Sequence, residues 1–353
     1  MSAALRLSGW GLGLTGTNPS VACLIVKNGT IIGRGVTAYG GRPHAEAQAL
    51  FEAGEMARGA TAYVTLEPCA HYGQSPPCAQ FIIDSGIIRV VFCVCDPDVR
   101  VSGRGVSLLL QQGIIVDKIL ETKGKRALRS YITRQVKKRS HVTIKLAVSQ
   151  DNMIGIVGRG NIPITGPISI AQSHVLRAQS DAILVGIGTV LSDNPELTCR
   201  LNGLSDLSPT RIILDSNLRL PLDSKIMRTA SLAPIIVITE NYDSIKSISL
   251  KKNNIKIVHC NSHDLSQLLS VLADLGITSL LVEGGATVIR SFITAGLVDS
   301  IILYRSNQII FSQGIPSPLE DQYIEDSFLC VRCDCFGSDF CFEYSRKNYC
   351  LQE

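Results

Sequence analysis

The chain has 353 residues, which is longer than one typical domain and predicts two. Hydrophobic residues make up 45% of it and charged residues 18%, a composition that can bury full cores and excludes an intrinsically disordered chain. The net charge of +4 is mild: it suits an anionic substrate and does not demand nucleic acid.

The first residues, MSAALRLSGWGLGLTG, contain one arginine and no long apolar stretch, so they do not have the pattern of a secretory signal. The longest apolar runs, such as IIRVVFCVC at 87–95, have the length of a strand and are far too short to cross a membrane. Twelve cysteines are present without the spacing of a disulfide scaffold. We therefore expect a soluble cytoplasmic protein with reduced thiols and no membrane partner.

The segment 20–95 alternates between predicted strands and helices. Two apolar runs at 20–36 are joined by Asn28-Gly29, a pair that favours the positive φ angles of a type I′ hairpin turn. A helix from about His44 to Met56 is followed by a strand at 60–66, a helix that starts at the proline pair and stops at Gly86, and a strand at 87–95. This order predicts a layered α/β domain.

A basic segment follows at 117–141, with nine Lys or Arg against two acids. It could bind nucleic acid, but because no aromatic platform accompanies it, a solvated connecting helix is favoured. We place the domain boundary here, with domains at 1–139 and 140–353. Beyond it, seven strand-like runs alternate with shorter helical segments up to residue 304, which predicts a second α/β domain with a largely parallel sheet.

Five cysteines lie near the end of the chain: Cys330, Cys333, Cys335, Cys341 and Cys350. A second metal site is one interpretation. The segment 328–344 also fits two strands around a Gly-Ser-Asp turn, with cysteine acting as a small hydrophobic residue. Because a pair of C-x-x-C knuckles is missing, we favour the two strands.

Three side chains between residues 44 and 78 form a candidate metal site. His44, Cys69 and Cys78 offer an imidazole and two thiolates, the ligands that Zn²⁺ prefers in tetrahedral geometry. A structural site would use four protein ligands, whereas three leave one position for water, as in catalytic zinc sites. Each cysteine directly follows a proline where a helix could begin, and a helix N-terminus favours thiolate over thiol.

Glu46 is the candidate acid/base. Positions i and i+2 do not share a helix face, so Glu46 can point away from the metal that His44 binds and move protons to a ring nitrogen and to departing ammonia. The order H-A-E, P-C, P-P-C matches the signature of zinc nucleobase deaminases, although eight residues rather than two separate the cysteines. The alternative is that His44, Glu46 and two buried cysteines occur together by chance. This would require unrelated residues to fall in the order of the signature.

Four stretches of the first half carry a family resemblance: NPSVACLIVKNG, GRPHAEAQAL, GATAYVTLEPCAHYGQSPPC and DPDVRVSGRGVSLLLQQGI. They resemble the deaminase half of the bifunctional riboflavin biosynthesis deaminase/reductase, whose own variant is the wide cysteine spacing. The resemblance implies a zinc-dependent domain with the cytidine-deaminase-like α/β/α fold. The sequence departs from the family at 17–22, which reads TNPSVA instead of Pro-Asn-Pro-x-Val-Gly, and at Thr37, where the family usually has a substrate-pocket His.

In the second half, the segment 280–299 predicts a strand, a turn at Gly284-Gly285 and a helix whose first amides could hold a phosphate. Glycine pairs after strands are also common as simple turns. The run VGIGTV at 185–190 lacks the full dinucleotide fingerprint. These motifs alone therefore favour a simple turn over a phosphate site.

The resemblance continues in order through IKLAVSQD, LRAQSDAILVGIGTVLSDNPELTCR, RIILDSN and VEGGATVI, so that it covers nearly the whole chain. It implies a dihydrofolate-reductase-like α/β domain that uses NADPH. The cofactor positions carried over are Ala147, Pro163, Thr189, Asp193, Ser216, Gly285, Ala286, Thr287, Val288, Ile289, Arg290 and Ser291. The substrate positions are Lys145, Asn161, Arg177, Leu197, Arg200 and Glu283. A phosphorylated substrate gives the two arginines a role as bidentate donors, with ordinary surface charge as the alternative.

Two segments of this half depart from the family pattern. Gln150-Asp151-Asn152 replaces Leu-Asp-Gly, and Pro163 stands where a Trp is expected against the cofactor. Losing that ring removes stacking area and would weaken hydride transfer.

We therefore expect a two-step enzyme of riboflavin biosynthesis. The first domain would hydrolytically deaminate 2,5-diamino-6-(5-phosphoribosylamino)pyrimidin-4-one with Zn²⁺ and Glu46. The second would reduce the ribosyl chain with NADPH to give 5-amino-6-(5-phosphoribitylamino)uracil. We expect this phosphoribosylaminopyrimidine as substrate, a homo-oligomer, and no nucleic-acid partner. Two alternatives stay open: a nucleic-acid base deaminase, supported only by the basic segment, and a zinc deaminase with a degenerate, non-catalytic second domain.

Overall fold

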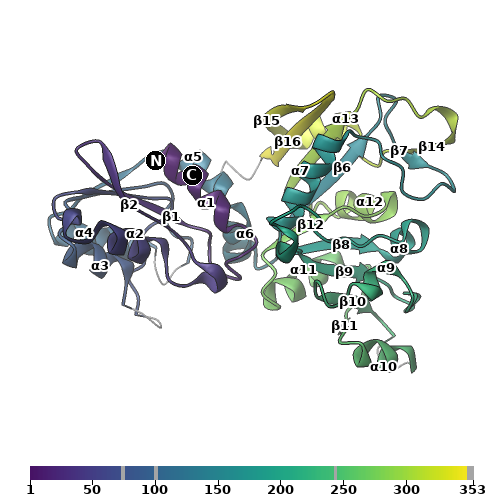
Figure 1. Cartoon of the computed structure of the whole chain (residues 1–353), viewed down its shortest axis with the longest axis horizontal. Helices are drawn as coiled ribbons and strands as arrows, with labels where there is room; N and C mark the ends of the chain where they lie inside the picture. Colours follow the sequence, from purple (N-terminus) through teal and green to yellow (C-terminus); the bar gives the residue numbers. More distant parts are fainter. Residues whose placement is uncertain (73–75, 99–101, 242–244, 348–353) are drawn as a thin grey trace. The chain divides into compact units, whose positions relative to one another are not determined.

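The structure, a computed structural model, describes residues 1–72, 76–98, 102–241 and 245–347. The chain forms two compact units, Met1–Lys138 and Arg139–Glu353, and most of their helices and strands are labelled in Figure 1. Across the described residues, none of the helices combines the length and the apolar character needed to cross a membrane.

Unit 1 is a five-stranded sheet with helices on both faces. Its strands are β1 (Ala22–Lys27), β2 (Thr30–Val36), β3 (Thr61–Val64), β4 (Arg89–Phe92) and β5 (Ile115–Lys118), in the order β2-β1-β3-β4-β5. Strand β1 runs antiparallel to β2 and β3, while β3, β4 and β5 are parallel. Its helices are α1 (Ser2–Ser8), α2 (Ala45–Ala53), α3 (Cys78–Asp84), α4 (Arg104–Gln111), α5 (Glu121–Ala127) and α6 (Arg129–Lys137).

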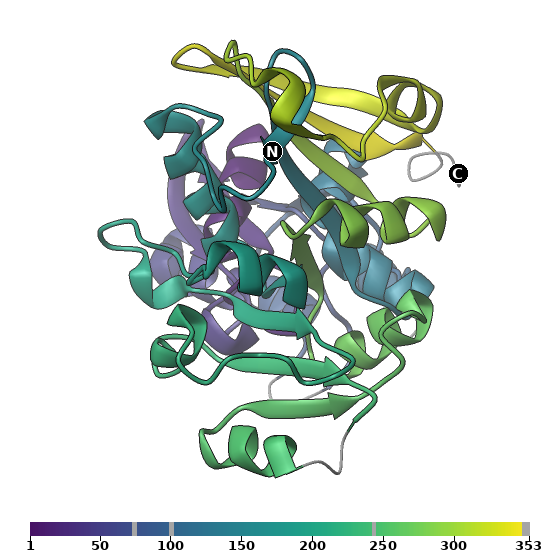
Figure 2. The same cartoon turned by 90° about the vertical axis from the view of Figure 1, so that its right-hand side faces the viewer.

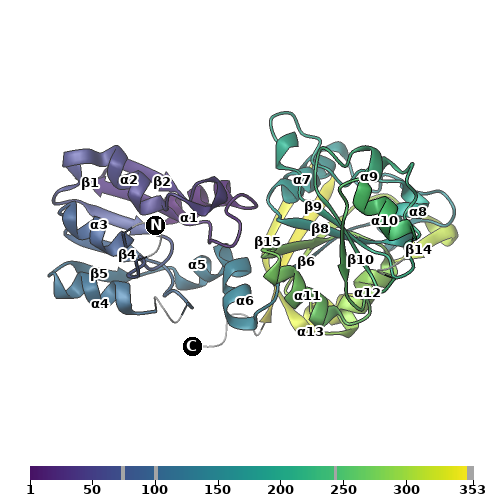
Figure 3. The same ribbon diagram turned by 90° about the horizontal axis from the view of Figure 1, so that it is seen from below.

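The alternation of side chains along β1 builds both layers of unit 1. Cys23 and Ile25 point into the cluster that also contains residues of α2 and α3, while Ala22 and Leu24 pack against α1. Figure 3 shows α2, α3 and α4 in succession beside the strands. The predicted hairpin is confirmed, because Asn28 (φ 52°) and Gly29 (φ 76°) both take the positive angles of its two-residue turn.

Unit 2 contains a nine-stranded sheet in the order β11-β10-β9-β8-β12-β6-β13-β16-β15, and a two-stranded sheet of β7 and β14. The strands are β6 (His141–Val148), β7 (Met153–Ile156), β8 (Ala182–Gly186), β9 (Thr210–Leu214), β10 (Ile235–Thr239), β11 (Lys256–His259), β12 (Ser279–Val282), β13 (Ser300–Arg305), β14 (Gly314–Pro316), β15 (Phe328–Phe336) and β16 (Asp339–Arg346). The helices are α7 (Pro167–Ala178), α8 (Ile187–Asp193), α9 (Lys225–Arg228), α10 (Ile245–Lys252), α11 (Leu265–Asp274), α12 (Ala286–Thr294) and α13 (Asp321–Ser327).

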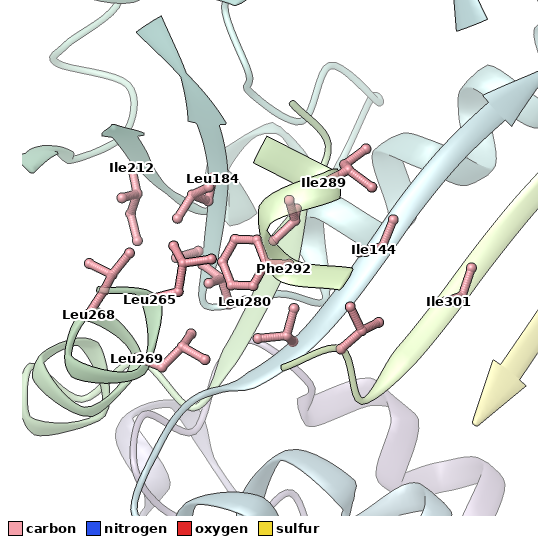
Figure 4. Close-up of a cluster of buried hydrophobic side chains, with 14 of the residues drawn as sticks. Ile144, Leu184, Ile212, Leu265, Leu268, Leu269, Leu280, Ile289, Phe292 and Ile301 are labelled. Atoms are coloured by element: carbon pink, nitrogen blue, oxygen red, sulfur yellow. The ribbon is translucent and has the colours of Figure 1, made fainter. Parts of the chain in front are cut away.

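The predicted largely parallel sheet is confirmed: every pair from β11 to β13 is parallel, and only the β15–β16 hairpin adds antiparallel strands. Figure 2 looks onto unit 2, with this hairpin at one edge of the sheet and β11 at the other. Two cores form on opposite faces. On one, Phe292 of α12 packs among Leu184, Leu280 and the leucines of α11 (Figure 4). On the other, Ile183 and Val185 face the side chains of α8 to α10.

Two expectations from the sequence need comment. The segment 117–141 is not one solvated connecting helix: it contains the end of β5 and two short helices, and Leu128 and Tyr131 are buried in the core of unit 1. The hydrophobic positions point inward, while Lys118, Lys123, Lys137 and Lys138 are exposed. The cysteine-rich end is the predicted pair of strands around a turn, and Cys350 lies outside the described residues.

Candidate active sites

In unit 1, two glycines of β2 set the position of the helix that carries His44 and Glu46. A Cβ on Gly33 would lie 2.1 Å from the carbonyl oxygen of Ala49, and one on Gly35 would lie 2.1 Å from that of Ala45. Any side chain at these positions would therefore push α2 away from the sheet. His44 is the N-cap residue of α2, and Glu46 lies in its first turn.

The structure brings His44, Cys69 and Cys78 together, with all three candidate ligand atoms within 4.8 Å of one another. The Nδ1 atom of His44 lies 3.3 Å from Sγ of Cys78 and 3.8 Å from Sγ of Cys69. In a tetrahedral zinc site with usual bond lengths, nitrogen and sulfur ligands lie about 3.6 Å apart. The two distances bracket this value, so the donor set fits Zn²⁺ in both geometry and chemistry.

Within the described ranges, no other group of His, Cys, Asp or Glu has metal-site geometry. The second metal site considered for the C-terminal cysteines is therefore not supported by the residues that the structure describes.

The two cysteines are not placed alike. Cys78 is the first residue of α3, as predicted, but Cys69 lies in an irregular segment and begins no helix. Its sulfur instead accepts a hydrogen bond from the backbone N–H of Cys78 at 3.3 Å. Hydrogen bonding from Cys78 and from His44 lowers the pKa of Cys69 to about 4, while the hydrogen bond to Cys69 and burial raise the pKa of Cys78. The thiolate at Cys69 thus arises from its neighbours rather than from a helix of its own.

Glu46 is 4% exposed, and burial together with the nearby Cys69 thiolate raises its pKa to about 7. A carboxyl group with a pKa near neutrality can both accept and donate a proton at physiological pH. Glu46 lies outside the three-residue ligand group, as the i, i+2 spacing predicted.

A cavity of about 490 Å³ opens beside these residues. Sequence reasoning missed several residues of its lining: Asn18, Arg42, His71, Asp98 and Arg134. They come from separate loops and from α6, so no local spacing in the sequence groups them. Thr37, which replaces the family His, also lines the cavity, and its Oγ1 accepts a hydrogen bond from the N–H of Val21 at 3.0 Å.

Two buried carboxylates of the cavity lining, Glu67 and Asp96, are hydrogen-bonded to the surrounding chain. Both oxygens of Glu67 accept backbone N–H groups, from Asp96 and Gly103 at 3.2 and 3.1 Å and from Gly105 and Val106 at 3.2 and 3.3 Å. They thereby satisfy the first amides of α4. The Oδ1 atom of Asp96 accepts the N–H of Asp98 and the hydroxyl of Tyr131, at 2.9 and 2.8 Å. This network ties α6 to the strand ends.

In unit 2, a glycine contact again sets the spacing of the elements. A Cβ on Gly284 would lie 2.5 Å from Cα of Val185, so the chain after β12 can approach β8 only because that position is glycine. Gly285 has φ 47° and is the N-cap of α12, which confirms the predicted strand, turn and helix.

Most of the predicted reductase residues line one cavity of about 430 Å³ in unit 2. These are Lys145, Ala147, Asn161, Pro163, Arg177, Thr189, Asp193, Leu197, Arg200, Glu283, Gly285, Ala286 and Ile289. The other five lie elsewhere. Thr287, Arg290 and Ser291 are exposed on α12, Val288 packs against the core and Gly186, and Ser216 pairs with Ser262 at 2.6 Å.

Three largely buried charges of the cavity lining lie together. Nε and Nη2 of Arg177 each lie 2.9 Å from an oxygen of Glu283, and Nζ of Lys145 lies 4.0 Å from the same carboxylate. Burial alone would raise the pKa of Glu283, but the charges of Arg177 and Lys145 outweigh it and lower it to about 2. Burial lowers the pKa of Lys145. The carboxylate of Glu283, 4.0 Å away, raises this pKa but does not fully offset the effect of burial. Glu283 is therefore a permanent carboxylate, and Lys145 an ammonium that gives up its proton more readily than usual.

The loop that carries Leu197 and Arg200 is held by α7. Nη1 of Arg177 donates to the carbonyl of Thr198 at 3.1 Å, and Nδ1 of His174 accepts the N–H of Arg200 at 3.3 Å. His174 lines the cavity and was missed from the sequence. Its position three residues before Arg177, on the same face of α7, was the available signal.

The two departures in this half differ in consequence. Asn152 takes φ 62°, a left-handed conformation that Gly adopts freely and Asn tolerates better than most residues, so the altered turn keeps its backbone. The carboxylate of Asp151 accepts the N–H groups of Ile310 and Phe311, which holds the turn in place. Pro163 lines the cavity and presents no aromatic ring there.

Both halves of the chain match known protein families. Residues 140–341 match the family model described as the RibD C-terminal domain, and residues 1–94 match the cytidine and deoxycytidylate deaminase zinc-binding region. The riboflavin biosynthesis protein RibD of Aquifex aeolicus is 39% identical over 311 residues, which cover 88% of this chain and 86% of that protein. The chain belongs to the RibD family.

RibD structures match over nearly the full length. A structure from Thermotoga maritima, described as a diaminohydroxyphosphoribosylaminopyrimidine deaminase/5-amino-6-(5-phosphoribosylamino)uracil reductase, is 34% identical with a TM-score of 0.86. The match covers 98% of this chain and 97% of that one. RibD of Acinetobacter baumannii is 32% identical, with the same TM-score and coverage.

The resemblance and the fold predicted from the sequence are thereby confirmed. The chain is a bifunctional deaminase/reductase of riboflavin biosynthesis, with a cytidine-deaminase-like zinc-binding domain followed by a dihydrofolate-reductase-like RibD reductase domain.

Proposed function

We propose that residues 1–139 deaminate 2,5-diamino-6-(5-phosphoribosylamino)pyrimidin-4-one, and that residues 140–353 reduce the ribosyl chain of the product with NADPH. The observation that carries the first step is the His44, Cys69 and Cys78 group beside a buried Glu46. Bound zinc supplies an activated water molecule. Glu46, with a pKa near 7, can carry two protons in turn, the first to the ring nitrogen and the second to the departing ammonia.

For the second step, NADPH supplies the hydride. Glu283 stays ionised, so we assign it the role of holding Arg177 and Lys145 rather than that of proton donor. Lys145, with its lowered pKa, is the better donor of the proton that the reduced sugar requires. Arg200 lines the cavity, and we assign it to the substrate phosphate. We extend the cofactor assignment to Ala147, Pro163, Thr189, Asp193, Ser216 and the run 285–291, and the substrate assignment to Asn161 and Leu197.

A two-part assay on the purified chain tests this function. Ammonia release from the diaminopyrimidine reports the deaminase, and NADPH oxidation after addition of the deaminated uracil reports the reductase. Ammonia release without NADPH oxidation would mean that unit 2 is the degenerate domain of the alternative. Activity on RNA or DNA and not on the free nucleotide would instead support the nucleic-acid deaminase. The homo-oligomer stays a prediction, which the mass in solution checks.

A further inference from the structure

In unit 2, the loop at 194–200 carries Leu197 and Arg200 into the cavity lining but contains no helix or strand. Leu197 takes φ 59° and is 4% exposed. A leucine holds this left-handed conformation only where its surroundings impose it, so contacts from outside the loop fix its backbone. The position of Arg200 therefore depends on the contacts that anchor this loop.

Helix α7 anchors the loop through two hydrogen bonds. Nη1 of Arg177 donates to the carbonyl of Thr198 at 3.1 Å, and the N–H of Arg200 donates to Nδ1 of His174 at 3.3 Å. His174 is 7% exposed and lines the same cavity. The guanidinium of Arg200 is half exposed and lies 3.7 Å from Glu196, which belongs to the same loop. Of the two bonds from α7, the one to His174 acts on Arg200 itself.

His174 is a neutral imidazole in this arrangement. Because its Nδ1 accepts a backbone N–H, this nitrogen carries no hydrogen, and the ring proton lies on Nε2. Burial and the positive charges of Arg177 and Arg200 lower the pKa of His174 from its ordinary value of 6.5. The carboxylate of Glu283 and a nearby backbone carbonyl act in the opposite direction and do not outweigh them. Lys145 of β6 adds another cation to the same lining.

We propose that His174 is a positioning residue of the reductase: its neutral imidazole holds the backbone of Arg200 so that the guanidinium meets the substrate. This inference rests on the proposed function, in which Arg200 contacts the substrate phosphate. Protonation would turn Nδ1 from an acceptor into a donor that faces the N–H of Arg200, and would add a positive charge beside Arg177. The loop would then lose an anchor on α7, and the reductase would bind its substrate less tightly at acid pH.

NADPH oxidation by the full-length chain, with the deaminated uracil as the varied substrate, tests this role. His174→Ala should raise the KM for the uracil about 5- to 30-fold, because a backbone N–H loses its acceptor, and should change kcat less than about threefold. The dissociation constant of NADPH, measured by fluorescence without the uracil, should stay within about threefold of the wild-type value. His174→Asn keeps an acceptor, Oδ1, near the position of Nδ1 and should restore most of the affinity at about pH 7.5.

Two further readouts separate this role from a merely structural one. Asparagine takes up no proton, so between about pH 7.5 and 5.5 the KM of the wild type should rise more steeply than that of His174→Asn. Titration of the substrate phosphate affects both enzymes alike and cancels in this comparison. In the Arg200→Ala background, His174→Ala should raise KM by less than about twofold, because the imidazole acts through Arg200.

His259→Asn is the matched control, because it removes an exposed imidazole of the edge strand β11 that does not line the cavity. NADPH binding reports that unit 2 is folded, and if His174→Ala fails this check, the pH profile of His174→Asn decides. No recovery by His174→Asn, equal pH profiles, or full additivity with Arg200→Ala would overturn the positioning role while leaving the reductase established. A wild-type chain that oxidises no NADPH with the uracil would instead overturn the proposed function itself.

Discussion

Replacing Glu283 with Gln should destabilise unit 2, and the loss should depend on pH in a defined direction. The folded-state pKa of Glu283 is about 2, against an ordinary value of 4.5. The unfolded chain therefore binds more protons between these two values. It follows that the stabilisation by the carboxylate is fully present above about pH 5 and is lost as pH falls toward 2.

The magnitude follows from the same two values. A difference of about 2.5 between folded and unfolded pKa values corresponds to roughly 3 kcal/mol at neutral pH. The side chain is almost fully buried and paired with Arg177 through two bonds of 2.9 Å, so little of this is screened by solvent. At pH 3.5 the contribution should have fallen to about 2 kcal/mol.

Native-state hydrogen exchange on the full chain measures this effect, because peptides from β12 and α7 report the opening of unit 2 and peptides from β1 report unit 1. Glu283→Gln should lose protection in β12 and α7 at pH 7, with unit 1 unchanged and a smaller loss at pH 3.5. Glu325→Gln removes an exposed carboxylate of α13 and serves as the charge control. A Gln variant with wild-type protection, or a loss that does not shrink with pH, would refute the role assigned to this ion pair.

Four further predictions concern the two sites. Cys69→Ala or Cys78→Ser should lose zinc and deamination together, and full zinc occupancy in a metal analysis would show that the ligand assignment is wrong. Glu46→Gln should keep its zinc while deamination falls by roughly two to four orders of magnitude; loss of the metal would make Glu46 a ligand. Arg200→Ala should mainly raise the KM for the uracil in the NADPH assay, and an unchanged KM would remove it from the phosphate contact. Gly35→Ala should lower the free energy of unfolding of unit 1 by about 1–3 kcal/mol in denaturant titration. It should also reduce zinc occupancy, since the added methyl meets the carbonyl of Ala45.

How far the sequence predicted the site depended on whether the signal was local. The hairpin at Asn28-Gly29 and the parallel strands of unit 2 follow from turn chemistry and apolar runs. His44 and Cys78 were found because metal chemistry restricts residue types. The expectation that a helix begins at Cys69 was wrong, because a preceding proline permits a helix to start at a residue and does not require it.

Residues that reach a site through tertiary contacts are harder to recognise in the sequence. The basic composition of 117–141 concealed the buried Leu128 and Tyr131, and with them the placement of Arg134 in the deaminase cavity. Asp96 and Glu67 could be seen in the sequence as acids near the zinc signature. Nothing local shows that the oxygens of Glu67 accept backbone amides far along the chain, or that Asp96 accepts the hydroxyl of Tyr131.

Both sites depend on glycines that touch no substrate. In unit 1, Gly33 and Gly35 let α2 lie on β2, and this places His44 at the N-cap and Glu46 in the first turn of the helix. In unit 2, Gly284 lets the chain after β12 pass Val185, so that Glu283 and the start of α12 reach the same cavity. A side chain at such a position cannot be accommodated by a rotamer change, because the obstacle is backbone. The geometry of the catalytic groups is therefore set by close backbone contacts, and substitution of these glycines should impair chemistry without altering any group that performs it.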